Sequence, residues 1–159
     1  MKKVMKSITV ALFSIYCLIL IYILFFGTRS AHAANWTYWT YIRRSFNPVP
    51  FKTIGEYFVR IANHTINTST VWKNILGNTV LFMPMGFLLP CISQRFNKFS
   101  KTIFTGILII VAIECMQLFS TLGSFDMDDI ILNSLGLTIG FIFFKCKPIN
   151  ILLKKLQII

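Results

Sequence analysis

Hydrophobic positions along the chain fall into four long runs that contain almost no charge. We predict membrane-crossing helices at about residues 8–26, 74–92, 102–119 and 130–144. A helix needs roughly 20 apolar residues to cross a hydrocarbon core, so the first three runs are long enough and the fourth is slightly short. The pattern therefore predicts an all-α, polytopic membrane protein, a bundle of about four transmembrane helices in a single membrane domain, residues 1–159.

The segments between these runs are polar and differ in character. Residues 27–73 form a long loop, which we place outside the membrane, and residues 145–159 form a basic tail. Within the loop, apolar residues recur at helical spacing from Thr53 to Ala62, which predicts a short amphipathic helix on the membrane surface. The stretch from Phe46 to Phe51 contains two prolines, and we expect it to be irregular or extended.

The first run has two interpretations. Ala31-His32-Ala33 has the small-x-small pattern of a signal-peptide cleavage site, which would place the cut after Ala33. The apolar run is longer than a usual signal-peptide core, and Arg29 lies between it and that site. We favour a retained span and leave cleavage open.

Composition supports a membrane protein and excludes other classes. Hydrophobic residues make up 55% of the chain and charged residues only 13%, whereas soluble domains carry about 25% charge. The net charge of +11 does not indicate nucleic-acid binding, because Lys and Arg are scattered between apolar runs and form no basic helix. We expect the cysteines to act as small hydrophobic residues, since they form no C-x-x-C pair: Cys17, Cys91, Cys115 and Cys146.

The distribution of charge predicts an orientation. Short cytoplasmic loops collect Lys and Arg, and here these residues cluster at the N-terminus, after the second run and in the tail. The loop 120–129 has neither, but contains three Asp. We therefore predict a multi-pass protein of the bacterial cell membrane with both termini in the cytoplasm. The long loop 27–73 is also basic, but long loops count less in this rule.

This orientation brings polar residues of separate spans to one depth near the outer face. Glu114 is the most informative, because a carboxylate inside a membrane is costly unless it is paired or neutralised. It could bind an incoming group or move a proton, or it could be a structural tie to Arg43, Arg44 or Asn78. The predicted outward-facing cluster comprises Arg43, Arg44, Asn47, Asn78, Glu114, Gln117, Asp126, Asp129 and Asn133.

The acidic stretch Asp126, Asp128 and Asp129 also has two interpretations. Clustered carboxylates could hold Mg²⁺ or Ca²⁺. The spacing is not that of an EF-hand, no histidine accompanies it, and acids at a helix N-terminus cap free amides. We favour capping and predict neither a metal nor a cofactor.

Small residues and a proline predict how the helices pack. Gly136 and Gly140 form a G-x-x-x-G pattern that lets two helix backbones approach closely. Asp129 and Asn133 share that face, so Asp129 should point inward. Pro84 should kink the second span two residues before Gly86, and such a break needs protein to cover the freed backbone groups.

Four segments in this order resemble the VanZ family. They are Arg44-Ser45-Phe46-Asn47-Pro48-Val49-Pro50-Phe51, Gly77-Asn78-Thr79-Val80-Leu81-Phe82-Met83-Pro84-Met85-Gly86-Phe87, Ile113-Glu114-Cys115-Met116-Gln117 and Phe125-Asp126-Met127-Asp128-Asp129-Ile130-Ile131-Leu132-Asn133-Ser134-Leu135-Gly136. The resemblance implies an integral membrane protein associated with low-level resistance to glycopeptide antibiotics, above all teicoplanin. It also implies that most of the polar cluster belongs to the family's motifs.

Three functions are compatible with these features. The first is a non-enzymatic envelope protein whose outward-facing site binds a lipid-linked cell-wall precursor or a glycopeptide. The second is a membrane enzyme acting on lipid-linked phosphate or peptidoglycan precursors, with Arg43 or Arg44 on phosphate and Glu114 or Asp129 as base. The third is a small lipid transporter or scramblase, which would need to form a homo-oligomer. All three have membrane lipids as partners and none involves nucleic acid.

Overall fold

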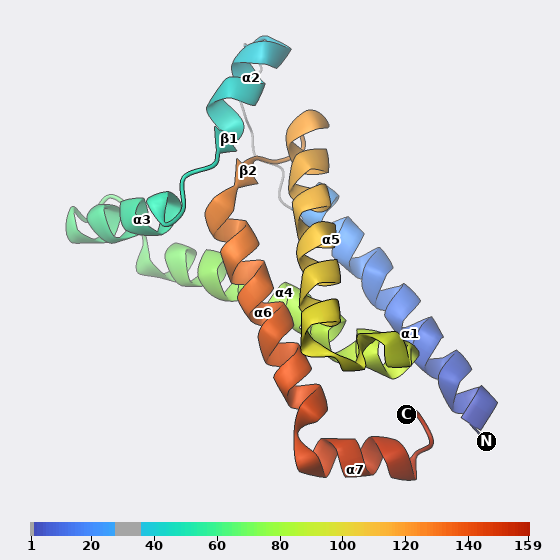
Figure 1. The fold of residues 1–159 in the computed structure, drawn as a ribbon. Coiled ribbons are helices and arrows are strands. Elements are labelled where there is room, and N and C mark those ends of the chain that lie inside the picture. The colour runs from blue at the N-terminus through green and yellow to red at the C-terminus, as the bar shows by residue number, and fades with distance from the viewer. Residues whose placement is uncertain (1, 28–35) are drawn as a thin grey trace.

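The computed structural model describes residues 2–27 and 36–159, so the possible cleavage site at Ala33 lies outside the described residues. Within these described residues, four helices are long and apolar enough to cross a membrane, which confirms the predicted fold class. They are α1 (Lys2–Tyr22), extended by a π-helical turn (Ile23–Gly27), α4 (Thr68–Ile92), α5 (Phe99–Phe119) and α6 (Met127–Lys145) (Figure 1).

All four helices begin before the apolar runs that predicted them, and polar side chains cap two of them. Asn67 caps α4, and its side chain accepts a hydrogen bond from the amide of Ser69 at 2.9 Å. Asp126 caps α6 in the same way by accepting from the amide of Asp128. With its polar first turn, α6 has 19 residues, close to the length that a crossing requires.

Short elements gather at one end of the bundle, which we call the sheet end. Strands β1 (Phe46–Asn47) and β2 (Phe125–Asp126) pair in parallel there, and the rings of Phe46 and Phe125 lie 5.0 Å apart. Helices α2 (Tyr38–Ser45) and α3 (Lys52–Ala62) flank β1 (Figure 1). Helix α3 corresponds to the amphipathic helix predicted from Thr53 to Ala62. A short 3₁₀ helix (Gln94–Asn97) joins α4 to α5, and α7 (Lys147–Lys155) lies in the tail.

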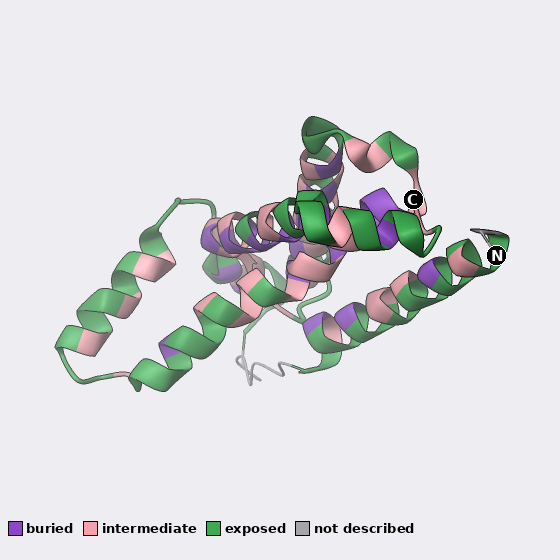
Figure 2. Cartoon of the chain, turned by 90° about the horizontal axis from the view of Figure 1, so that it is seen from below, coloured by how far each residue is buried: buried purple, intermediate pink, exposed green. Residues whose placement is uncertain are grey.

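Exposed surface on the long helices is apolar. Figure 2 shows that most of α1 is exposed, whereas buried positions concentrate where α4, α5 and α6 meet. Leu12, Ile15 and Leu18 of α1 are each more than half exposed. Such a continuous apolar surface is unfavourable in water and is what lipid chains would cover.

Glycines allow α4 and α6 to pack backbone to backbone. A Cβ atom at Gly136 would overlap the carbonyl oxygen of Thr79, and one at Gly140 would overlap that of Met83, one turn further along α4. Gly86 lies in the same way against the carbonyl of Leu137. These three positions therefore set the distance and the register between the two helices.

Helix α4 continues through Pro84 as a single helix. Proline removes a helical hydrogen bond and disturbs the carbonyls of the preceding turn. The hydroxyl of Tyr16 on α1 donates to one of these carbonyls, that of Leu81, at 2.7 Å. A neighbouring helix thus supplies a partner near the break.

We predict that Gly136→Ala lowers the free energy of unfolding in detergent by about 1–3 kcal/mol, because the added methyl forces backbone carbonyls away from α6. Gly77→Ala is the matched control on α4, where a Cβ meets no atom within 4 Å. It should be neutral or slightly stabilising, since Ala favours a helix over Gly. Equal effects of the two changes would contradict the close contact.

Candidate functional site

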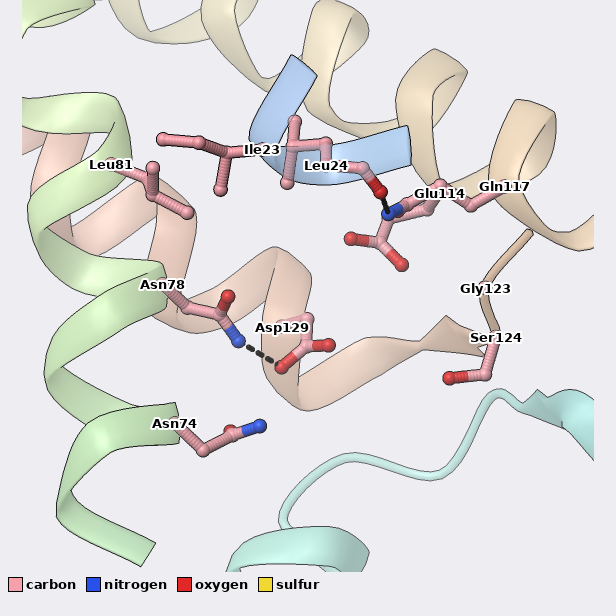
Figure 3. A pocket seen from close by; sticks show the side chains of 10 residues that line it. All are labelled: Ile23, Leu24, Asn74, Asn78, Leu81, Glu114, Gln117, Gly123, Ser124 and Asp129. Carbon is pink, nitrogen blue, oxygen red and sulfur yellow. Dashed lines mark hydrogen bonds between the residues drawn. The ribbon is translucent and has the colours of Figure 1, made fainter. Parts of the chain in front are cut away.

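A polar cavity of about 260 Å³ lies between the long helices, toward the sheet end. Side chains from α4, α5 and α6, the π-helical turn and the α5–β2 loop surround it (Figure 3). We call it the acidic cavity, because within residues 2–27 and 36–159 the charged groups that line it are two carboxylates. It is lined by Ile23, Leu24, Asn74, Asn78, Leu81, Glu114, Gln117, Gly123, Ser124 and Asp129.

Hydrogen bonds between elements hold the walls of the acidic cavity in place. The side-chain amide of Asn78 on α4 donates to the Asp129 carboxylate on α6 (Figure 3). The amide of Gln117 on α5 donates to the carbonyl of Leu24 at 2.9 Å. This carbonyl belongs to the π-helical turn, where widened geometry leaves backbone groups available for such contacts.

Glu114 presents a carboxylate that is only partly satisfied. Its side chain is 3% exposed, and Oε2 accepts a long hydrogen bond of 3.4 Å from the amide of Asp126. Within residues 2–27 and 36–159, Oε1 has no hydrogen-bond partner. Figure 3 shows both oxygens directed into the space that Asn78 and Asp129 also face. The partner of Glu114 is thus a backbone amide, and not Arg43, Arg44 or Asn78.

A second cavity of about 440 Å³ lies beside the first, between α2, α3 and β2. We call it the basic cavity, because three of its lining residues are cationic and two, Glu56 and Asp126, are acidic. Arg44, Lys52 and Arg60 are exposed at its rim, and the guanidinium of Arg44 lies 4.7 Å from the ring centre of Trp36. The cavity is lined by Trp36, Arg44, Ser45, Asn47, Lys52, Thr53, Glu56, Arg60, Ser124 and Asp126.

Two residues lie where the cavities meet. Ser124 lines both. The carboxylate of Asp126 faces the basic cavity and accepts from Thr53 at 2.5 Å and from Asn47 at 3.3 Å. The backbone amide of the same residue donates to Glu114 in the acidic cavity. Asp126 therefore forms part of a thin wall between them.

The three aspartates of the acidic stretch have separate partners. Asp126 caps α6, and Asp128, 1% exposed, accepts from the amides of Phe51 and Ile54 at the start of α3. Asp129 alone turns into the acidic cavity. Asp126 thus caps the helix that follows it, as we favoured, whereas Asp128 binds amides at the start of another helix, α3. Among the described residues, no group of three His, Cys, Asp or Glu side chains could hold a metal ion.

The structure divides the predicted polar cluster among several places. Four members line the acidic cavity, namely Asn78, Glu114, Gln117 and Asp129, and three line the basic cavity, namely Arg44, Asn47 and Asp126. The remaining two line neither. Arg43 is exposed on α2, and Asn133 is 2% exposed at the α4–α6 contact, where its Oδ1 has no partner in the described part of the chain.

Sequence reasoning missed several lining residues. Lys52, Glu56 and Arg60 are spaced four apart, so they share one face of α3, and this spacing was a readable signal. Asn74 and Ser124 carried no such signal. Asn74 lies at the start of an apolar run and Ser124 lies in the middle of the 120–129 loop, and an isolated polar residue is ordinary in both places.

Together, the apolar helices and the paired cavities define a polytopic membrane protein with a polar site at one end of its bundle. A family model described as VanZ/LLP1 matches residues 13–152, which is most of the chain. The chain therefore belongs to the VanZ family. Neither the curated proteins nor the solved structures gave a significant match.

We predict that Asp128→Ala loosens α3 from the bundle, because two backbone amides lose their shared acceptor. Loss of a cap costs about 1 kcal/mol, so hydrogen exchange of the 51–56 amides should speed up by about tenfold or less while α5 is unchanged. Glu56→Ala removes an exposed acid from the same helix and is the control. Unaltered exchange in Asp128→Ala would show that the cap is not needed.

Proposed function

We propose that this protein binds a lipid-linked ligand of the bacterial cell envelope at its two cavities and thereby lowers susceptibility to teicoplanin-type glycopeptides. The single observation that supports this is the meeting of an acidic and a basic cavity at Ser124, at one end of an apolar bundle. A ligand that reaches both must carry polar groups and lie at a membrane surface.

The exposed cations favour an anionic group on the ligand. Arg and Lys at a membrane interface bind phosphate through charge-assisted hydrogen bonds, and Arg can do so with two parallel bonds. Arg44, Lys52 and Arg60 come from two helices and converge on one cavity. Lipid-linked cell-wall precursors carry phosphate at this depth.

The proposed link to glycopeptide susceptibility is the access of the drug to its target. A protein that binds a lipid-linked precursor, or the drug itself, at the outer membrane surface changes how much of the target the drug reaches. This requires the sheet end to face outward, with both termini in the cytoplasm. We infer this orientation from the charge distribution, because the loop before β2 has no Lys or Arg whereas the 95–101 connection has three.

We predict that Glu114→Gln lowers the teicoplanin resistance of expressing cells to that of cells without the protein. The change removes a charge that faces the acidic cavity while keeping the shape of the side chain. The measurement is the minimal inhibitory concentration at matched membrane abundance. Lys154→Gln on α7, distant from the sheet end in Figure 1, is the control and should match the wild type. Unchanged resistance in Glu114→Gln would exclude this acid from the function.

The orientation can be tested by cysteine labelling in a Cys146→Ser background, since Cys146 is an exposed native thiol. Leu122, 43% exposed in the loop before β2, should react as Leu122→Cys with a membrane-impermeant maleimide in intact cells. Lys98→Cys, exposed between α4 and α5, should react only after permeabilisation. The reverse pattern would overturn the proposed orientation.

A further inference from the structure

The acidic cavity has two carboxyl groups and, among the described residues, no cationic side chain in its lining. Its charged lining groups are Glu114 and Asp129, and none of its ten lining residues is Lys or Arg. A carboxylate at membrane depth is costly unless an opposite charge or a proton neutralises it. The amide of Asn78 supplies one hydrogen bond to Asp129 but no charge. A bound cation would supply the opposite charge that the described lining lacks.

The geometry favours an organic ammonium over a metal ion. Glu114 Oε1 is directed into the cavity with no partner among the described residues, and Asp129 and the nearby amides offer further acceptors. A primary ammonium has three donors and no acceptor, which matches this set. Mg²⁺ requires about six octahedral oxygens, and the described residues contain no three-ligand cluster. Apolar side chains of Ile23, Leu24 and Leu81 also line the cavity and suit methylene groups.

The basic cavity constrains the rest of the ligand. It shares Ser124 with the acidic cavity, and Asp126 contacts both sides through its carboxylate and its amide. A molecule that occupies both sites must therefore place its anion and its cation close together on a short linker.

We infer that the two cavities together bind one zwitterionic headgroup, with a primary ammonium in the acidic cavity and a phosphate against Arg44, Lys52 and Arg60. The headgroup chemistry is that of phosphoethanolamine. The inference rests on the proposed function and names the ligand class of the same site. The exposed apolar faces of the helices make a membrane lipid the expected carrier of this headgroup.

The test is equilibrium binding of short-chain lipids to the purified full chain in detergent, measured by native mass spectrometry. Dihexanoyl phosphatidylethanolamine should bind about tenfold more tightly than the matching phosphatidylglycerol, which has the phosphate but no ammonium, as expected for one charge-assisted hydrogen bond. Phosphatidylcholine should also bind weakly, because its trimethylammonium cannot donate. Equal affinity for the three lipids would overturn the inference.

Variants separate the two halves of the site. Glu114→Gln and Asp129→Asn should each remove the preference for ethanolamine while phosphatidylglycerol binding is kept. Arg44→Gln should weaken all three lipids alike, whereas Arg43→Gln, its exposed neighbour outside both cavities, should change none. A preference that survives in both acid variants would contradict the ammonium site.

Free O-phosphoethanolamine identifies the carrier of the headgroup. If free O-phosphoethanolamine binds more weakly than the short-chain lipid, the ligand is a membrane lipid. If the two bind equally, the protein recognises the headgroup alone, and the ligand is a soluble molecule that carries it. The lipid-binding assay can reject the ligand class independently of the resistance assay. Equal lipid affinities with Glu114→Gln still sensitising cells would leave the proposed function standing and remove only the ligand class.

Discussion

The contact between α4 and α6 is the constraint on which the rest of the structure depends. Helices in lipid gain little from hydrophobic association, so close van der Waals packing must hold them together. Thr79 lies against Gly136 and Met83 against Gly140, so the two helices run in parallel with a fixed register. That register places Asn78, next to Thr79, within reach of Asp129 near the start of α6. The acidic cavity thus originates in a glycine pattern two turns away.

A second level of organisation comes from aspartates that cap helices. Asp126 ends the α5–β2 loop and starts α6, while its carboxylate also holds Thr53 and Asn47. Asp128 anchors the first turn of α3, where Phe51 adopts a positive φ of 63°. These buried acids fix α3 against the bundle, and α3 in turn supplies two of the three cations of the basic cavity. These two acids hold structural elements together, whereas Glu114 and Asp129 face the acidic cavity.

Much of this arrangement was predictable from the sequence, and the rest depends on long-range pairing. Hydropathy located four helices but missed the polar turns that start them, because caps lie outside an apolar run. Depth arguments placed Glu114, Gln117 and Asp129 near one another. They could not distinguish Arg43 from Arg44, since neighbours on a helix point about 100° apart and α2 was not predicted. The parallel pairing of Phe46 with Phe125 joins segments far apart along the chain, and no local pattern signals it.

The cations of the first loop have a physical explanation in this structure. Residues 27–73 are basic, which runs against the orientation that the short loops favour. Arg44, Lys52 and Arg60 line the basic cavity, and if this cavity is a binding site, as we propose, their charge carries less information about topology. The opposite sign of the acidic cavity beside them would be unfavourable for a simple anion. The zwitterionic headgroup that we propose would place one charge against each cavity.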